Sequence, residues 1–392
     1  MSSSLAMPPV HADPPKRPRV AHVGKFYPPH RGGIETHLEA MCKALTAWFD
    51  LEVIVANDGR RTVNQVLDGV SIKRLGSWFN FAGAPVCPAM VKAIRDARAD
   101  LVHLQWPNPM AFVAYLASKH QGPLVVSWQS DVIRQKTLDR LFAPITRAVL
   151  ERAALILVSS PNYAASSRFL AEHRGTCRVV PLAISSELFR QFDPAAVERI
   201  RKRYGNRIVL SVGRLVYYKG IEYLIRAMTR VRGTLLIIGE GPLRSKLERQ
   251  SRASGVADRV IFLGDVADLV PFYHACDVFV LPSIARSEAF GIVQLEAMAC
   301  AKPIVNTRLD SGVPFVSPDG LTGITVTPAD EEVLAKAVTM LLDDPQLRDK
   351  FGQAGLRRVR EEFAVDKMAI LVRAIYDELL RVQATPGVSA RS

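Results

Sequence analysis

A chain of 392 residues, 48% of them hydrophobic, exceeds the roughly 250 to 300 residues at which a single core stops growing, so we expect two domains. No apolar run approaches the ~20 residues of a membrane-spanning helix, so we expect a soluble or peripheral protein. Residues 1–190 carry 23 Lys and Arg against 14 Asp and Glu; without zinc-finger, RNA-binding or helix-turn-helix motifs, this favours anionic lipid or a diphosphate over nucleic acid.

The two ends of the chain are polar. Residues 1–18 contain five prolines and three serines and lack the apolar core of a signal peptide, so we expect flexible tails here and over residues 385–392. The five cysteines are scattered without any C-x-x-C pair, which favours buried thiols in the reducing cytoplasm over disulfides or zinc.

Short β-branched runs alternate with amphipathic stretches, which is typical of parallel sheets covered by helices. Strands are predicted in the first half at residues 20–23, 51–56, 101–104, 124–127 and 155–159. The second half repeats the series at 208–212, 235–238, 260–263, 278–281 and 303–306. The polar segment 182–203 separates the two series, so we expect one α/β domain over 19–190 and a second over 191–365.

The last predicted elements, after a strand at 323–326, are helices at residues 331–342, 346–360 and 366–384. The final helix has one apolar face, which must pack against another element. That face consists of Met368, Leu371, Ile375 and Leu379.

A first candidate site follows the first predicted strand. Gly32 and Gly33 open a predicted helix, where glycines let a phosphate approach backbone N–H groups at the positive end of the helix dipole. Taken alone, this dipeptide is better explained as an ordinary strand-to-helix turn.

A second candidate site follows the first strand of the second half. Arg214 and Lys219 flank a turn at the carboxyl end of this strand, where open α/β sheets bind ligands. Two fixed cations suit the neutralisation of a departing diphosphate. A solvated basic turn is the alternative explanation.

A third candidate site contains two acids, Glu288 and Glu296. Glu288 precedes a helix predicted to begin near residue 290, and Glu296 is expected about two turns along it, so one carboxylate can reach a sugar and the other a ribose. Glu296 has apolar neighbours, which favours burial with a partner over a solvated surface position. The N–H groups at the helix start can meet phosphate oxygens, namely those of Phe290, Gly291, Ile292 and Val293.

Together these motifs resemble glycosyltransferase family 4, which comprises retaining enzymes of the GT-B fold and includes bacterial mannosyl- and rhamnosyltransferases of polysaccharide and glycolipid assembly. The resemblance covers residues 20–363, and its most specific marker is the E-x7-E pair of Glu288 and Glu296. It implies two Rossmann-like, doubly wound α/β domains facing a cleft. The first domain would bind the acceptor and the second the donor nucleotide, and the last helix would cross back to the first domain.

The resemblance also implies roles for individual residues. Arg214 and Lys219 are expected to bind the diphosphate. Glu288 is expected to bind the hydroxyls of the donor sugar, and Glu296 those of the ribose. The Gly32–Gly33 turn is expected to contact the diphosphate from the acceptor side.

Two turns and two glutamines complete the implied site. The turns containing Gly241 and Val266 occupy the places that flank the nucleobase in the family, although ordinary strand-to-helix turns explain them equally well. The family places a histidine at the end of the fourth strand, where this chain has Gln129, and often another where it has Gln105. Gln129 can donate a hydrogen bond to a sugar hydroxyl but cannot carry a proton.

The resemblance implies retention of anomeric configuration by same-face attack, with the departing diphosphate accepting the proton of a saccharide or polyprenyl-linked acceptor. No D-x-D sequence occurs in the chain, so we expect neither a catalytic metal nor another cofactor. Segments 128–136 and 306–314 are similar to transferases that use GDP-mannose or GDP-rhamnose. A UDP-hexose is the close alternative donor.

Two other classes remain open. A sugar nucleotide epimerase shares the architecture but needs an acid and a base near the anomeric carbon. A catalytically silent subunit that binds nucleotide sugar or partner proteins is motivated by Gln105 and Gln129, whereas Arg214, Lys219 and the acid pair argue against it.

The basic first domain leads to a surface hypothesis. Residues 134–152 predict a helix with Leu138, Leu141, Ile145 and Val149 on one face, and residues 78–81 form an aromatic loop. Burial in the core explains the helix face slightly better. The charge nevertheless favours anionic lipid by about 1 kcal/mol per basic residue near the surface, so we expect peripheral binding to the inner face of the cytoplasmic membrane.

Overall fold

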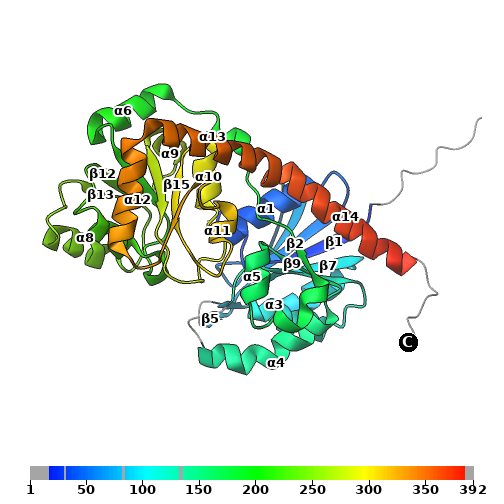
Figure 1. Cartoon of the computed structure of the whole chain (residues 1–392). Coiled ribbons are helices and arrows are strands. Elements are labelled where there is room, and N and C mark those ends of the chain that lie inside the picture. Colours follow the sequence, from blue (N-terminus) through cyan, green and yellow to red (C-terminus); the bar gives the residue numbers. More distant parts are fainter. Residues whose placement is uncertain (1–16, 31, 82–83, 132–135, 385–392) are drawn as a thin grey trace, which may run out of the picture.

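The computed structural model describes residues 17–30, 32–81, 84–131 and 136–384. Each half of the chain forms a sheet with helices on both faces, and the halves lie against each other (Figure 1). The predicted tails, apart from residues 17 and 18, lie outside the described residues. The doubly wound α/β architecture expected from the sequence is confirmed.

Within the described residues, the first sheet has eight strands in the order β10-β9-β8-β7-β1-β2-β4-β3, and only the β3–β4 pair is antiparallel. The central strands are buried along almost their whole length, as expected for strands covered on both faces. The bounds are β1 (Arg19–Val23), β2 (Asp50–Ala56), β3 (Val63–Leu67), β4 (Val70–Leu75), β7 (Leu101–Trp106), β8 (Leu124–Trp128), β9 (Leu155–Val158) and β10 (Cys177–Val179). A separate antiparallel pair consists of β5 (Phe79–Phe81) and β6 (Ala84–Val86).

Two hydrophobic cores hold the helices of the first domain on its sheet. One core lies under α2 (Ala89–Asp96), α3 (Pro109–Ser118) and α4 (Lys136–Arg152), and it contains the stacked rings of Trp106 and Trp128, whose centroids are 4.9 Å apart. The other core lies under α1 (Gly33–Leu45), where Leu38 and Met41 are buried. The short helix α5 (Pro161–Ser166) follows β9.

The described second sheet has six parallel strands in the order β13-β12-β11-β14-β15-β16. Their bounds are β11 (Ile208–Val212), β12 (Thr234–Ile238), β13 (Val260–Gly264), β14 (Val278–Leu281), β15 (Ile304–Thr307) and β16 (Gly323–Val326). The helices are α6 (Pro194–Tyr204), α7 (Ile221–Ala227), α8 (Arg244–Ala253), α9 (Val270–Ala275), α10 (Val293–Ala299), α11 (Val313–Val316), α12 (Glu331–Asp343) and α13 (Pro345–Glu362). Helix α6, which begins within the polar segment 182–203, packs on α9 of this domain.

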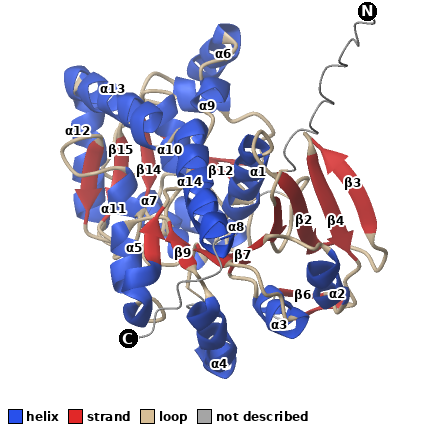
Figure 2. Cartoon of the chain, turned by 90° about the vertical axis from the view of Figure 1, so that its right-hand side faces the viewer, coloured by secondary structure: helices blue, strands red, loops and turns tan. Residues whose placement is uncertain are grey.

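The last helix, α14 (Val365–Ala384), crosses from the second domain to the first and packs beside α1 (Figure 2). This confirms the predicted crossing. Met368 and Ile375 face the core as predicted, but Leu371 is 46% exposed. Val372 and Tyr376 are buried instead, because the contacting face follows a four-residue spacing from Met368.

Candidate active site

Both sheets reverse their strand order at one point. In the first sheet β1 leads to β2 on one side while its neighbour β7 leads to β8 on the other. In the second sheet β11 and its neighbour β14 diverge in the same way, toward β12 and β15. Open α/β sheets bind ligands at such points, at the carboxyl ends of the strands. The predicted motifs lie there: Gly32 and Gly33 follow β1, Arg214 and Lys219 follow β11, and Glu288 follows β14.

Lys219 and Glu288 form an ion pair at the switch point of the second sheet. Lys219 Nζ lies 2.6 Å from Glu288 Oε2, which also accepts a 2.9 Å hydrogen bond from Ser283 Oγ. The two side chains are only 12% and 10% exposed. Burial lowers the pKa of Lys219, but the Glu288 carboxylate, together with Tyr218 and Glu296, raises it, and the net shift is upward. Lys219 therefore stays a cation inside a low-dielectric site.

Gly213 makes room for this lysine. Its φ is 148°, in the region that favours glycine, and a methyl group there would lie 3.2 Å from Lys219 Nζ. The side chain of Arg214, the next residue, is exposed. The structure therefore separates the two predicted cations, because Lys219 is paired and largely buried whereas Arg214 faces solvent.

Glu296 is held by Tyr273, whose hydroxyl donates a 2.6 Å hydrogen bond to Glu296 Oε2. Burial raises the pKa of Glu296, against the opposing effects of the Tyr273 hydrogen bond and the Lys219 cation. Glu296 therefore lies within electrostatic reach of Lys219. The two acids of the E-x7-E pair thus share one cation.

The predicted start of the following helix is wrong. Helix α10 begins at Val293 with Ile292 as its N-cap, so Glu296 lies in its first turn and not two turns along. Gly291, with φ at 75°, cannot continue a right-handed helix back to Phe290. Phe290 is buried in the core, and the N–H groups predicted at a helix start belong mostly to the preceding loop.

The first domain approaches this loop through α1. A methyl group at Gly33 would lie 3.7 Å from Ile292 Cγ2, so the glycine turn and the loop before α10 face each other across the domain interface. Lys25, just after β1, also lies here. Burial lowers the pKa of Lys25, and the Arg214 cation adds to this shift against the opposing effect of Glu35. Sequence reasoning missed Lys25, although its place after a predicted strand was a signal.

Gln129 and Gln105 meet at the ends of β8 and β7. Gln129 Nε2 donates a 2.8 Å hydrogen bond to Gln105 Oε1, and both side chains are buried. Gln129 Oε1 and Gln105 Nε2 are without a partner in the described structure. Gln129 also lines a small pocket with His37. The structure thus brings together the two glutamines singled out in the sequence.

A buried polar network lies behind these glutamines and reaches α14. Tyr376 Oη lies 2.5 Å from His103 Nδ1 and 3.2 Å from His22 Nε2, and His103 Nε2 lies 2.8 Å from Ser127 Oγ. Burial lowers the pKa of His22 to about 3, so this histidine is neutral near pH 7.

The turns predicted to flank the nucleobase have structural explanations. A methyl group at Gly241 would lie 2.5 Å from the backbone oxygen of Leu215, so this glycine permits a close approach of two loops. Val266 is partly buried against the core of the second domain.

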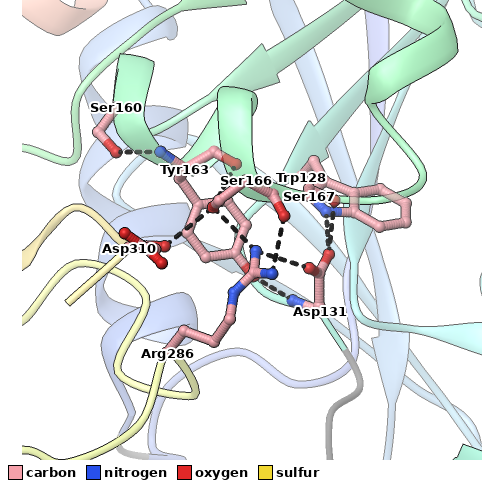
Figure 3. Close-up of polar contacts among 8 residues, drawn as sticks. All are labelled: Trp128, Asp131, Ser160, Tyr163, Ser166, Ser167, Arg286 and Asp310. Atoms are coloured by element: carbon pink, nitrogen blue, oxygen red, sulfur yellow. Dashed lines mark hydrogen bonds and ion pairs between the residues drawn. The ribbon is translucent and has the colours of Figure 1, made fainter.

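One arginine that sequence reasoning missed spans the domain interface (Figure 3). Arg286, two residues before Glu288, contacts Asp131 and Ser166 of the first domain. Asp131 lies two residues after Gln129. No sequence spacing distinguished Arg286 from a solvated basic residue.

The described residues contain no group of three or more His, Cys, Asp or Glu side chains arranged to hold a metal ion. None of the helices in this part of the chain has the length and apolarity needed to span a bilayer.

Comparisons with known proteins agree with this geometry. Residues 194–358 match the family described as glycosyl transferases group 1, and residues 32–183 match the glycosyl transferase 4-like domain. A GDP-mannose-dependent alpha-(1-6)-phosphatidylinositol monomannoside mannosyltransferase of Mycolicibacterium smegmatis is 30% identical, over 84% of this chain and 90% of that protein. The chain belongs to glycosyltransferase family 4.

Other relatives of the transferase match over most of both chains. O-antigen chain mannosyltransferase C of Escherichia coli is 28% identical, over 92% of this chain and 99% of its own. The D-rhamnosyltransferase WbpZ of Pseudomonas aeruginosa is 29% identical, over 88% and 92%. The recognition made from the motifs is therefore confirmed at the level of the family.

Solved structures confirm the GT-B fold of the transferase. The sucrose-phosphate synthase of Thermosynechococcus elongatus has a TM-score of 0.78 at 23% identity and covers 93% of this chain and 100% of its own. The Anabaena protein HepE in complex with UDP-glucose has a TM-score of 0.76 at 21% identity, over 92% and 100%.

Proposed function

We propose that this glycosyltransferase moves a hexosyl group from a nucleotide diphosphate sugar to a saccharide or lipid-linked saccharide acceptor in cell-surface polysaccharide or glycolipid synthesis. The observation that carries the proposal is the Lys219–Glu288 pair, with Glu296 in electrostatic reach, at the switch point of the second sheet. Two largely enclosed carboxylates can accept hydrogen bonds from the sugar and the ribose. The mannosyl- and rhamnosyltransferase relatives support a hexose.

In the proposed reaction the protein mainly positions charge. Lys219 and Arg214 stabilise the negative charge that develops on the departing diphosphate, and the Gly33 turn of α1 approaches from the acceptor domain. Glu288 orients the donor sugar, and Gln129 donates to one of its hydroxyls. Attack on the same face retains the anomeric configuration, and the diphosphate accepts the acceptor proton. The absence of a D-x-D sequence supports charge neutralisation by side chains without a metal.

We propose GDP-mannose or GDP-rhamnose as the donor. The GDP-mannose-dependent relative and the similarity of segments 128–136 and 306–314 to such transferases support this choice, although residues 132–135 lie outside the described structure. A panel of GDP- and UDP-hexoses, scored by nucleotide release with lipid-linked acceptors, tests it. Release from UDP-hexoses alone would contradict the proposed base.

The same assay separates the other two classes. A sugar nucleotide epimerase would convert the donor without any acceptor. A silent binding subunit would bind nucleotide and release none with any donor and acceptor pair. Acceptor-dependent nucleotide release with formation of a longer saccharide is the result that we expect.

We also propose that the transferase works at the anionic inner face of the cytoplasmic membrane. Helix α4 is only partly in the core, because Val149 is buried whereas Leu141 is 71% exposed. Residues 79–81, predicted as part of an aromatic loop, form strand β5, and Trp78 just before it is 65% exposed. A groove beside α4 is lined by Arg140, Arg147 and Arg168, together with Ala143, Phe169 and Glu172. The side chain of Leu138, predicted on the same face, lies outside the described side chains.

Liposome flotation tests the membrane proposal. Anionic vesicles should carry the transferase, neutral vesicles should not, and binding should weaken with salt. The double variant Arg140→Gln/Arg147→Gln should reduce binding, whereas Arg199→Gln/Arg230→Gln, which removes two exposed arginines of the second domain, should not. Equal flotation with both kinds of vesicle would contradict the proposal.

A further inference from the structure

The loop after β14 reaches into the other domain through Arg286. Arg286 Nη2 lies 3.1 Å from Asp131 Oδ2 and 2.9 Å from Ser166 Oγ, and Nη1 donates a 2.7 Å hydrogen bond to the backbone oxygen of Ser166 (Figure 3). The guanidinium carbon lies 5.5 Å from the ring centroid of Tyr163. These contacts all cross from the donor-side loop to the first domain.

Asp131 is held so that one of its oxygens faces this arginine. Asp131 Oδ1 accepts hydrogen bonds from Trp128 Nε1 at 2.9 Å and Ser167 Oγ at 2.8 Å. The backbone N–H of Asp131 donates to the Tyr163 hydroxyl. These contacts leave Oδ2 directed at Arg286. The carboxylate is therefore already held in place for the arginine.

Ser166 closes a second connection across the same interface. Its Oγ donates a 2.9 Å hydrogen bond to the backbone oxygen of Asp310, in the loop after β15. That loop is tied to the donor-side loop, because the Gly312 N–H donates a 2.7 Å bond to the Ala289 oxygen. Two loops of the second domain are therefore bound to the end of α5.

The ion pair is shielded enough from solvent to influence the relative arrangement of the two domains. The Arg286 and Asp131 side chains are 31% and 12% exposed, so salt screens their attraction less than that of a surface pair. A charge pair across an interface fixes the register of the two surfaces. Because these contacts exist only when the domains lie in this arrangement, they shift the equilibrium toward it.

We propose that Arg286 is a positioning residue, and that with Asp131 and Ser166 it forms an inter-domain latch. The latch holds the Glu288 loop against the segment that carries Gln129, two residues before Asp131, so that residues from both domains meet one donor sugar. This inference rests on the proposed function. Most of the proposed nucleotide contacts, those of Arg214, Lys219 and Glu296, lie in the second domain, and the Gly33 turn adds one from the first. Nucleotide affinity should therefore depend on the latch far less than turnover does.

Kinetics of four variants test the latch: Arg286→Gln, Arg286→Lys, Asp131→Asn and the double variant Arg286→Gln/Asp131→Asn. We expect kcat to fall roughly five- to thirtyfold in Arg286→Gln, with the Kd for the free nucleoside diphosphate unchanged within twofold. Arg286→Lys should recover part of the loss, because the ammonium can still meet Asp131. The double variant should be no worse than Arg286→Gln, since both changes remove one interaction.

Arg201 offers a matched control. Its Nη2 lies 3.2 Å from Asp277 Oδ1, and the side chains are 33% and 9% exposed, close to the values of the latch pair. Both residues belong to the second domain. Arg201→Gln should therefore disturb folding about as much as Arg286→Gln while leaving kcat unchanged.

Small-angle scattering of the full chain supplies a readout that needs no activity. Arg286→Gln should have a larger radius of gyration than the parent, and Arg201→Gln should not. A parent without transferase activity would refute the proposed function while the scattering still tested the latch. The latch is overturned if the radius of gyration stays unchanged, if nucleotide affinity falls as much as kcat, or if the losses of the single variants add.

Discussion

The two domains contribute to the candidate site in opposite ways. The second domain supplies charges that already have partners, since Lys219 pairs with Glu288 at 2.6 Å and the Tyr273 hydroxyl donates to Glu296 at 2.6 Å. Apart from Lys25, the first domain supplies neutral groups, and Gln129 Oε1 is buried without a partner in the described structure. Paired charges are organised before a ligand arrives, whereas an open acceptor awaits a donor. We infer that the second domain provides most of the affinity and the first provides orientation.

The largest effect is expected from removing a charge of the second domain. Lys219→Ala removes the cation that faces the diphosphate and leaves the largely buried Glu288 without its partner, so turnover should fall by about 10²- to 10³-fold. Donor titrations beside thermal melts separate this from unfolding. Lys302→Ala is the control, because its Nζ donates a 2.8 Å bond to the His274 backbone oxygen and not to either acid. Parent-like turnover of Lys219→Ala would mean that the donor binds elsewhere.

A second prediction concerns the neutral half, through pH. Burial lowers the pKa of His22 to about 3 and of His37 to about 4, both below the ordinary 6.5. As pH falls below 6.5 the unfolded chain binds these protons first, so the free energy of unfolding should drop by up to about 1.4 kcal/mol per pH unit for each group. Denaturant unfolding at pH 7, 6 and 5 measures the slope. His37→Asn should flatten it, and an unchanged slope would contradict the assignment.

A third prediction tests the ribose contact. Glu296→Gln keeps an oxygen for the Tyr273 hydroxyl but removes the charge, so binding of the nucleoside diphosphate should weaken roughly tenfold. Isothermal titration measures it, and melting should change little because the amide has almost the same shape. Unchanged nucleotide affinity would place the ribose away from α10.

The sequence predicted the local features of the site and missed those that depend on distant parts of the chain. The strands that lead to the site and the pair Glu288 and Glu296 were predicted, because they depend on local periodicity and short spacing. The start of α10 was missed because the conformation of the loop before it sets the positive φ of Gly291, and this φ keeps the helix from beginning at Phe290. Contacts such as Arg286 with Asp131, 155 residues apart, join segments with no common pattern, so no spacing predicts them. The strands β3 to β6 were also missed. Strand β3 gave no signal because it lies at the edge of the sheet, is exposed along its length and lacks apolar alternation.

The smallest effect is expected from changing a neutral side chain of the first domain, Gln129. Gln129→Ala removes the donor to Gln105 Oε1 and the amide proposed to meet a sugar hydroxyl, each a hydrogen bond between neutral groups. Such a bond is worth about 0.5 to 1.5 kcal/mol, so turnover should fall roughly two- to tenfold. Gln129→His should retain or raise turnover, because an imidazole N–H can take over the donation. Gln121→Ala, which alters an exposed glutamine that bonds only within its own turn, is the control in the same domain. Steady-state kinetics with the preferred donor measure these changes. Equal turnover of an active parent and Gln129→Ala would contradict a role of Gln129 in the site.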